Sequence, residues 1–310
     1  MTFIASAAAR LEPAALVVGF DCRTHSVRKA DCPSYKAQRA AKAPDLAEQL
    51  DAAPVLLREA GICVVVAPGL EADDVLAGAA ALGRRDGWRT TLVTSDRDAF
   101  ALIDDTTSVL RLVKGGIDAS PVLTPEELVR AFKVTPGQYR DYAALRGDAS
   151  DNLPGVTGIG PATASRLLTA FGTLDDAYVA LDGGRRGDVA AVIGLAATAA
   201  LASVAGRAAV VLNRRLMTMH AGIELPPADA MRLPLDRERV RAALRAREIR
   251  LGPSLWALLG GTPSRWPGPD AYPRTPRPAV AAAAPVGLAA PATRTVTGRG
   301  QVEARQLSLF

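Results

Sequence analysis

The chain has 310 residues, of which 49% are hydrophobic, and a formal net charge of +5. Its two histidines, His25 and His220, stand far apart and its three cysteines follow no zinc-binding spacing, which argues against zinc sites and against serine–histidine or cysteine–histidine catalysis. No apolar run approaches the ~20 residues of a membrane-spanning helix and no signal peptide leads the sequence, so we expect a cytoplasmic, nucleoid-associated protein.

Short β-branched runs alternate with helical patterns along the first part of the chain. Strands are predicted at residues 16–20, 62–66, 90–93 and 109–113, and helices at about 44–60, 71–86 and 96–103. Unbroken apolar strands that alternate with helices are typical of a parallel sheet covered on both faces. The fold class predicted from this pattern is therefore α/β.

Acidic residues directly follow three of these strands. Asp21 follows the first, the segment 71–74 follows the second, and Asp96 with Asp98 follows the third. Because ligand sites of open α/β sheets lie at the carboxyl ends of strands, we expect these acids to meet at one edge. A single acid at a helix start is usually an N-cap. Clusters at three strand ends favour a site for hard cations, Mg²⁺ or Mn²⁺.

A fourth acidic segment, residues 147–152, runs into a glycine-rich turn that ends at Pro161. The segment and the turn contain Asp148, Asp151, Gly155, Gly158 and Gly160. Glycines permit tight turning and the close approach of phosphate to backbone N–H groups, and Pro161 suits the first turn of a helix. A structural corner between two helices has the same appearance. Metal ions beside a phosphate cradle would suggest cleavage of a phosphodiester.

In their order and spacing, these motifs closely resemble the bacterial 5′-3′ exonuclease (flap endonuclease) family, which includes the N-terminal domain of DNA polymerase I. The resemblance covers about residues 1–250 and is carried by segments 19–21, 35–39, 71–74, 95–98 and 147–161. It implies a PIN-like parallel sheet with flanking helices, followed by a helix–three-turn–helix (helix-hairpin-helix) DNA-binding region.

The resemblance also implies two groups of metal ligands. The first comprises Asp21, Glu71, Asp73, Asp74 and Asp96. The second comprises Asp98, Asp148 and Asp151, with Asp96 close to both. Two or more Mg²⁺ or Mn²⁺ ions are therefore expected.

Further roles follow from the same resemblance. Duplex DNA is expected to contact Gly155, Gly158, Gly160 and Thr163 of the hairpin, whose carbonyl groups are also a plausible site for K⁺. Lys36 and Arg39, the expected catalytic cations, lie on a segment that resembles the family's arch over the active site, and Tyr35 could stack on an unpaired base. Without the resemblance, a solvated helical face is the simpler interpretation of this segment.

The resemblance is incomplete at the amino terminus. Family members begin with a strand that ends in Asp-Gly, whose aspartate is a metal ligand, and with a helix that follows it. The sequence here begins at Met1 with residues that align with a later helix. Loss of a central strand would expose apolar edges on its neighbours. We expect a true start upstream of Met1 rather than a naturally shortened protein, and weak or absent activity without that strand.

Charge is distributed unevenly along the chain. Residues 261–310 carry six arginines against two acids, and residues 1–260 carry 31 basic and 30 acidic residues. When the eight proposed metal ligands are set aside, 22 acids remain in that body. The rest of its surface is therefore basic, as a DNA-binding surface should be.

The last part of the chain changes in composition. Residues 261–305 are rich in proline and alanine and are predicted to be a disordered linker. Residues 306–310 resemble the peptide with which bacterial replication and repair proteins bind the sliding clamp. Its expected anchor residues are Gln306, Leu307, Leu309 and Phe310.

The expected function is a divalent-metal-dependent 5′-3′ exonuclease or flap endonuclease that hydrolyses DNA, including RNA-primed flaps, in replication and repair. The expected organisation is a nuclease domain at 1–145, a DNA-binding region at 146–260, the linker at 261–305 and the clamp peptide at 306–310. One alternative is a non-catalytic adaptor that binds flap DNA. Another is a PIN-type ribonuclease, whose small domain would not require the hairpin region.

Overall fold

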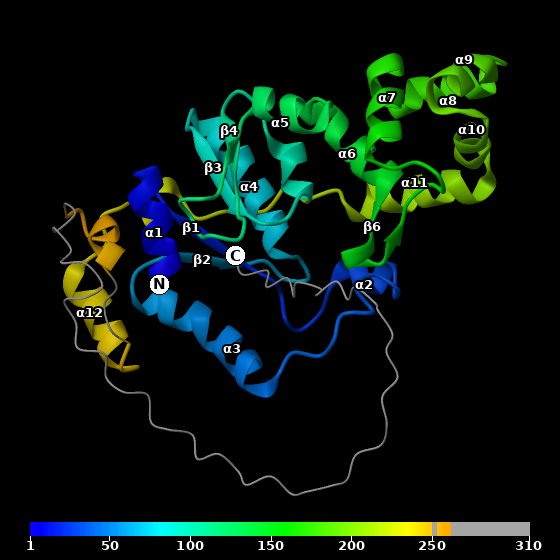
Figure 1. The fold of residues 1–310 in the computed structure, drawn as a ribbon. Coiled ribbons are helices and arrows are strands. Elements are labelled where there is room, and N and C mark those ends of the chain that lie inside the picture. The colour runs from blue at the N-terminus through cyan, green and yellow to red at the C-terminus, as the bar shows by residue number, and fades with distance from the viewer. Residues whose placement is uncertain (250–252, 262–310) are drawn as a thin grey trace, which may run out of the picture. The chain divides into compact units, whose positions relative to one another are not determined.

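The computed structural model describes residues 1–249 and 253–261 (Figure 1). The predicted linker and clamp peptide fall almost entirely on residues 262–310 and so lie outside the described residues. No single helix among the described residues is long and apolar enough to cross a membrane, and one bent pair, Leu195–Ala202 with Val204–Leu216, meets that test by length and composition only.

The first part of the chain alternates helices and strands as predicted. Its elements are α1 (Thr2–Leu11), β1 (Val17–Phe20), α2 (Val27–Asp31), α3 (Pro44–Glu59), β2 (Cys63–Val66), α4 (Ala72–Asp86), β3 (Thr90–Thr94), η1 (Asp98–Leu102), β4 (Thr107–Arg111) and β5 (Val122–Leu123). The α/β fold class is confirmed.

The helix predicted at 96–103 is instead the short 3₁₀ helix η1. The side chain of Asp96 accepts a hydrogen bond from the backbone N–H of Asp98 at 2.9 Å, which holds the chain in a tight turn up to that residue. Ile103, which ends η1, is extended and buried at 3% exposure. A turn at one end and a buried extended residue at the other leave too few residues for an α-helix.

The predicted parallel sheet, from which a central strand was expected to be missing, is divided into two. β1 pairs in parallel with β2, with Val17 opposite Cys63, while β3 pairs in parallel with β4 and β5 joins β4 antiparallel. Among the described residues, β1 and β3 are not joined in one sheet. A cavity of about 510 Å³, lined by residues of α1, α4 and both strands, lies between them. Within the described part of the chain, each of the two strands therefore has one edge without a strand partner.

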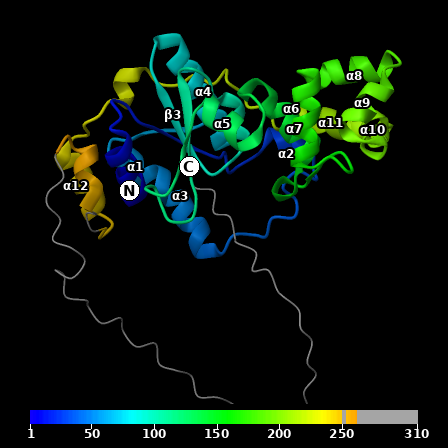
Figure 2. The ribbon, with the colours of Figure 1, turned by 45° about the horizontal axis from the view of Figure 1, so that its top comes forward.

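The second part of the chain is mainly helical (Figure 2). Its elements are α5 (Pro125–Phe132), α6 (Pro136–Arg146), β6 (Gly147–Asp148), η2 (Ala149–Asp151), β7 (Leu153–Pro154), α7 (Pro161–Phe171), α8 (Leu174–Asp182), α9 (Arg186–Ile193), α10 (Leu195–Ala202), α11 (Val204–Leu216), η3 (Ala228–Met231), α12 (Arg237–Arg245) and η4 (Pro253–Leu258).

Two large hydrophobic clusters stabilise these elements. The larger one joins β3, β4 and η1 to α6–α11 and includes Phe100, Tyr139 and Leu167, all fully buried. The other, which we call the terminal cluster, joins α1, β1 and α3 to α12 and η4, and includes Ile4, Val240 and Leu258. Residues near 240–258 therefore complete the core of the amino-terminal part, although they follow the helical region in sequence.

Candidate functional site

The carboxylates after β1 and at the start of α4 lie together. Asp21 follows β1 and accepts a hydrogen bond from the backbone N–H of Ala72 at 2.8 Å. Glu71 is the N-cap of α4 and forms a capping box with Asp74. These contacts satisfy N–H groups at the helix start, where negative charge is also favourable. The two acidic segments are thereby fixed to each other.

The acids after β3 extend this group. The hydroxyl of Thr94 accepts from the N–H of Asp96 at 3.0 Å, and Asp96 in turn accepts from the N–H of Asp98. Asp73 is half-buried, and burial, reinforced first by the negative charge of Asp96, raises its pKa well above the ordinary value. The same two causes raise the pKa of Asp98, and the negative charge of Asp148 raises it further. The sequence prediction that these acids converge agrees with this electrostatic coupling.

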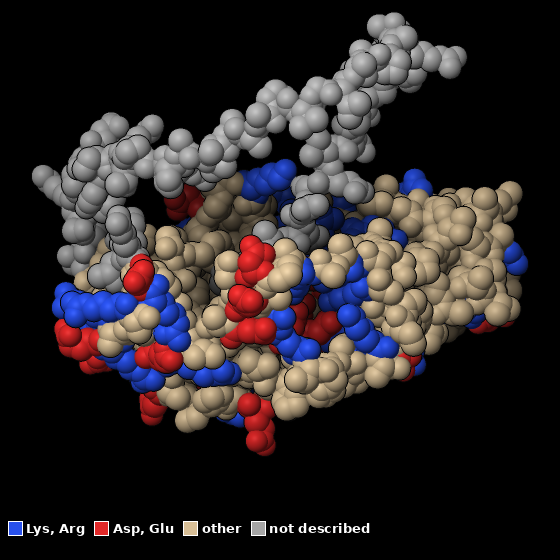
Figure 3. Space-filling view, turned by 90° about the horizontal axis from the view of Figure 1, so that it is seen from below, with Lys and Arg blue, Asp and Glu red and all other residues tan. Residues whose placement is uncertain are grey.

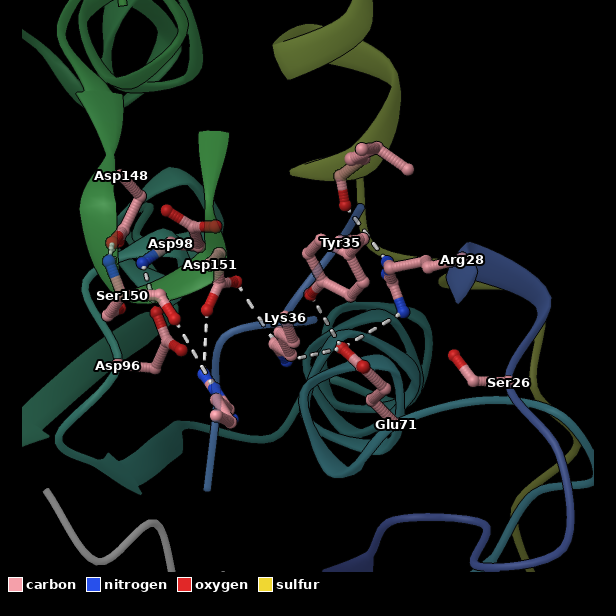
Figure 4. A network of polar contacts seen from close by, with 12 residues as sticks. Ser26, Arg28, Tyr35, Lys36, Glu71, Asp96, Asp98, Asp148, Ser150 and Asp151 are labelled. Carbon is pink, nitrogen blue, oxygen red and sulfur yellow. Dashed lines mark hydrogen bonds and ion pairs between the residues drawn. The ribbon is translucent and has the colours of Figure 1, made fainter. Parts of the chain in front are cut away.

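The segment after α6 carries the remaining carboxylates to the same place (Figure 4). Asp148 accepts from the N–H and the hydroxyl of Ser150, each at 2.7 Å. Asp151 is 7% exposed, and burial raises its pKa although the nearby cations Lys36 and Arg39 act in the opposite direction. Acids from all four predicted segments thus surround one site.

Two cations lie among these acids. Lys36 Nζ is 3.0 Å from Glu71 Oε2 and 3.8 Å from Asp151 Oδ2. Arg39 Nη2 donates to Asp151 Oδ1 at 2.6 Å. Lys36 has a positive φ of 54°, and its backbone N–H donates to the carbonyl of Asp151 at 2.9 Å, which anchors this unusual conformation. On the face shown in Figure 3, basic and acidic side chains adjoin around a hollow.

Tyr35 does not have the exposed position that stacking on a base would require. Its side chain is 3% exposed, and its hydroxyl donates to Glu71 Oε2 at 3.1 Å. In this structure the ring helps to hold Glu71. The stacking role stays a prediction that would need a rearrangement of this segment.

Asp74 also differs from its neighbours. It has no exposed surface, and its carboxylate receives a two-pronged pair of hydrogen bonds from Arg28, both at 2.6 Å. Sequence reasoning gave Arg28 no role. The two residues are 46 positions apart, and no local pattern in the sequence relates them. A metal-binding role for Asp74 stays a prediction, and this pairing argues against it.

The glycine-rich hairpin joins α6 to α7. Gly158 has a positive φ of 77°, and a Cβ atom built on Gly158 or Gly160 meets nothing within 4 Å. Gly147 and Gly155 differ, since a Cβ on either would lie less than 2.5 Å from backbone atoms of the other strand or of α6. Thr163 is half-buried in the first turn of α7. The open glycines are therefore the ones that leave room for a ligand.

The acids of this site offer carboxylate oxygens, which are suitable ligands for hard divalent cations. Within the described ranges, however, no group of three or more His, Cys, Asp or Glu side chains is already arranged to hold a metal ion. Glu71 and Asp151 are instead paired with Lys36 and Arg39. Metal binding would require these carboxylates to exchange their cationic partners.

We expect the metal-free protein to become less stable as the pH rises above the ordinary range of aspartate. The pKa values of Asp73 and Asp98 are raised in the folded state, so that state holds more protons than the unfolded chain in this window. The free energy of unfolding must then fall as the pH rises through the window. Urea denaturation in a chelator, at a series of pH values, measures the effect.

Asp98→Asn is the matching variant, since it removes one of the two raised groups. Its free energy of unfolding should depend less on pH than that of the wild type. An equally steep dependence in both proteins would show that Asp98 is not a source of the effect.

Two family models match successive parts of the chain. Residues 1–133 match the family model described as 5′-3′ exonuclease, N-terminal resolvase-like domain, and residues 134–238 match 5′-3′ exonuclease, C-terminal SAM fold. DNA polymerase I of Mycobacterium bovis is 36% identical over 241 residues, which are 77% of this chain and 25% of that protein. The thermostable DNA polymerase I of Thermus thermophilus is 31% identical over 259 residues, 82% of this chain and 29% of that protein.

Solved structures share the fold. The T5 5′-exonuclease with bound zinc has a TM-score of 0.56 at 22% identity, covering 70% of this chain and 79% of its own. The bacteriophage T5 D15 flap endonuclease, in a pseudo-enzyme-product complex with DNA and metal ions, has a TM-score of 0.54 at 20% identity, covering 78% and 88%. The chain spans about a quarter of the length of the curated polymerases it matches.

Proposed function

Since the chain belongs to the 5′-3′ exonuclease family, we propose that it is a divalent-metal-dependent hydrolase that cleaves phosphodiester bonds of 5′-ended or branched DNA. The observation that carries this proposal is the convergence of acids from the ends of β1 and β3, the start of α4 and the segment after α6. Burial, and after it that crowding, raises the pKa values of Asp73 and Asp98. Such crowding is relieved when cations bind.

Metal ions would be held by carboxylates in two neighbouring groups. Asp21, Glu71, Asp73 and Asp96 form one, and Asp98, Asp148 and Asp151 form the other. Bound divalent cations would supply an attacking water of lowered pKa and would stabilise the leaving oxygen. The zinc bound to the T5 exonuclease, which has the same fold, is in line with a divalent ion.

Lys36 and Arg39 would then act on the substrate. Both cations are directed at carboxylates, with the Lys36 side chain 11% exposed and the Arg39 side chain 45% exposed. Once these carboxylates bind metal, the two cations are free to bind phosphate oxygens of the strand. Arg39 is the better suited to a two-pronged contact, because its guanidinium group presents paired donors.

The hairpin is proposed to hold duplex DNA through backbone contacts with phosphate. We expect Gly160→Val to weaken duplex binding while leaving the fold intact. A Cβ atom at this position meets nothing within 4 Å, and the φ of Gly160, −89°, is one that any residue adopts. The side chain would instead occupy the space that a phosphate needs beside the N–H groups of α7.

The measurement is duplex affinity at moderate salt, together with the thermal unfolding temperature. The control is Gly187→Val, another glycine with nothing within 4 Å of its Cβ position, on α9. Unchanged affinity in Gly160→Val would argue against the hairpin's role.

The proposed activity is tested on a labelled 5′-flap oligonucleotide, with Mg²⁺ in one series and chelator in the other. Weak cleavage near the junction that requires Mg²⁺ is the expected result. Binding of the flap with no cleavage at any Mg²⁺ concentration would instead favour the adaptor. Cleavage of single-stranded RNA with no preference for the flap would favour a ribonuclease.

Several finer features belong to the same proposal. RNA-primed flaps are the proposed natural substrates, K⁺ the proposed ligand of the hairpin carbonyls, and the cytoplasm the proposed location. Residues 306–310, outside the described part of the chain, are proposed to bind a sliding clamp. A tether of this kind would raise the local concentration of the nuclease at junctions.

A further inference from the structure

Arg28 is a buried cation whose donors are almost all engaged. It lies on α2 and is 7% exposed. Its two terminal nitrogens donate to the two oxygens of Asp74. The remaining donations go to backbone carbonyls at the end of α11 and just after it, from Nε to Leu216 at 2.9 Å and from Nη2 to Thr218 at 3.0 Å. One side chain thus connects three segments that are far apart in sequence.

Asp74 is as fully occupied as its partner. Besides the contacts from Arg28, its Oδ2 accepts from the N–H of Glu71 at 2.9 Å, and its Oδ1 accepts from the N–H of His220 at 2.8 Å. Each oxygen therefore has two donors, which fills the roughly four acceptor positions of a carboxylate. Burial alone would raise the pKa of Asp74, but the hydrogen bonds from Arg28, His220 and Glu71 outweigh it and hold the pKa below the ordinary value.

The pair lies directly beneath proposed metal ligands. Asp74 is in the first turn of α4, directly after Asp73. Glu71 is the N-cap of the same helix. Arg28 Nη1 is also 3.5 Å from Glu71 Oε2 (Figure 4). A shift of the pair would therefore move the backbone that presents both acids.

We propose that Arg28 and Asp74 are positioning residues, which lock the first turn of α4 to the 216–220 segment and so hold Glu71 and Asp73 in place for divalent cations. This inference rests on the proposed function. It assigns Asp74 a supporting role in place of direct metal contact. It also means that the position of these acids depends on residues 216–220, which begin at the end of α11.

Simple electrostatics makes the opposite prediction for Arg28, which allows a sharp test. Removing a positive charge beside an acidic cluster should increase the affinity of the cluster for a cation. If Arg28 instead acts by positioning, Arg28→Met should lower that affinity. Loss of supporting contacts around metal ligands typically costs about 10–100-fold in affinity, so a fall of about 10-fold is expected here.

The experiment measures Mn²⁺ binding to the free protein by electron paramagnetic resonance, well below the unfolding temperature of every variant. Arg28→Lys keeps the charge but loses the paired donors, so its affinity should lie between those of the wild type and Arg28→Met. Arg214→Met is the matched control, because Arg214 is a partly buried cation of α11 that pairs with Asp141 at 2.7 Å. It should bind Mn²⁺ as the wild type does.

Amide hydrogen exchange gives a second measurement that needs no metal. Arg28→Met should increase exchange both at residues 71–75 and at 216–220, because the pair joins these two segments. Should Arg28→Met not fold, Arg28→Lys provides the same comparison with a smaller effect. Arg214→Met should leave the exchange of residues 71–75 unchanged.

The outcomes separate this inference from the proposed function. If the wild type binds Mn²⁺ and Arg28→Met binds it equally or more tightly, positioning is wrong and the proposed function stands. If the wild type binds no Mn²⁺, the proposed function is contradicted. In that case, unchanged exchange at 71–75 and 216–220 in the Arg28 variants would still overturn the inference, and increased exchange at both would support the structural lock.

Discussion

Asp96→Ala should reduce Mg²⁺-dependent cleavage of a 5′ flap by about 10³-fold or more, because a lost metal ligand removes several kcal/mol of transition-state stabilisation and each 1.36 kcal/mol is tenfold in rate. Asp96 is the residue placed to affect both metal groups. After burial, its negative charge is the largest cause of the raised pKa of Asp73 and of Asp98. Binding of flap DNA should persist, since one less carboxylate also means less repulsion of phosphate.

Single-turnover cleavage at saturating Mg²⁺ and flap affinity in Ca²⁺ are the two measurements. Asp118→Ala, which removes an exposed carboxylate between β4 and β5, should cleave at the wild-type rate. Full activity of the Asp96 variant would show that Asp96 is not a metal ligand. Loss of both cleavage and DNA binding would indicate a damaged fold instead.

Phe100→Ala should lower the free energy of unfolding by about 3–5 kcal/mol, the usual cost of emptying a buried aromatic position. Phe100 has no exposed surface, and its ring lies 5.5 Å from Phe132 and 5.3 Å from Tyr139, centroid to centroid. These aromatic contacts join η1 to α5 and α6. The neighbouring side chains are large and closely packed, so they could move only a little into the cavity that the substitution leaves.

Urea denaturation with the wild type and Leu195→Ala as references would measure this loss. Leu195 is 82% exposed on α10, so its truncation should change the unfolding free energy by no more than about 0.5 kcal/mol. A similarly small change in Phe100→Ala would mean that the aromatic cluster is not part of the cooperative core. Since Phe100 follows Asp98 by two residues, the same variant should also cleave more slowly.

The sequence predicted the order of helices and strands well, because hydrophobic patterning is a local property. The predicted strand at 62–66 and helix at 44–60 correspond to Cys63–Val66 and Pro44–Glu59. The pairing of strands was less accessible. The runs at 16–20 and 90–93 do not by themselves indicate that β1 and β3 lie on opposite sides of a cavity. Only the family resemblance, which expects a further central strand, pointed to a gap in the sheet.

The candidate site shows the same division. Acids at strand ends were brought together as expected, since parallel strands direct their carboxyl ends to one edge. The partners of those acids were not foreseen. Arg28 meets Asp74 across 46 positions and the carbonyl of Leu216 across 188, and such contacts depend on the packed fold alone. Tyr35 was likewise expected at the surface, yet its ring is buried beside Glu71.

The terminal cluster affects the order in which parts of the protein can fold during synthesis on the ribosome. Ile4 and Val18 are made early, but their core partners Val240, Leu244 and Leu258 are made more than two hundred residues later. The larger cluster ends at Met217 and can close sooner. Domains generally fold from the amino terminus onward during synthesis. β1 and β2 are an exception, because their apolar side chains stay uncovered until the late core partners have been made. Their core is complete only after η4 has left the exit tunnel, so we expect this first-made layer to expose apolar side chains to chaperones during synthesis.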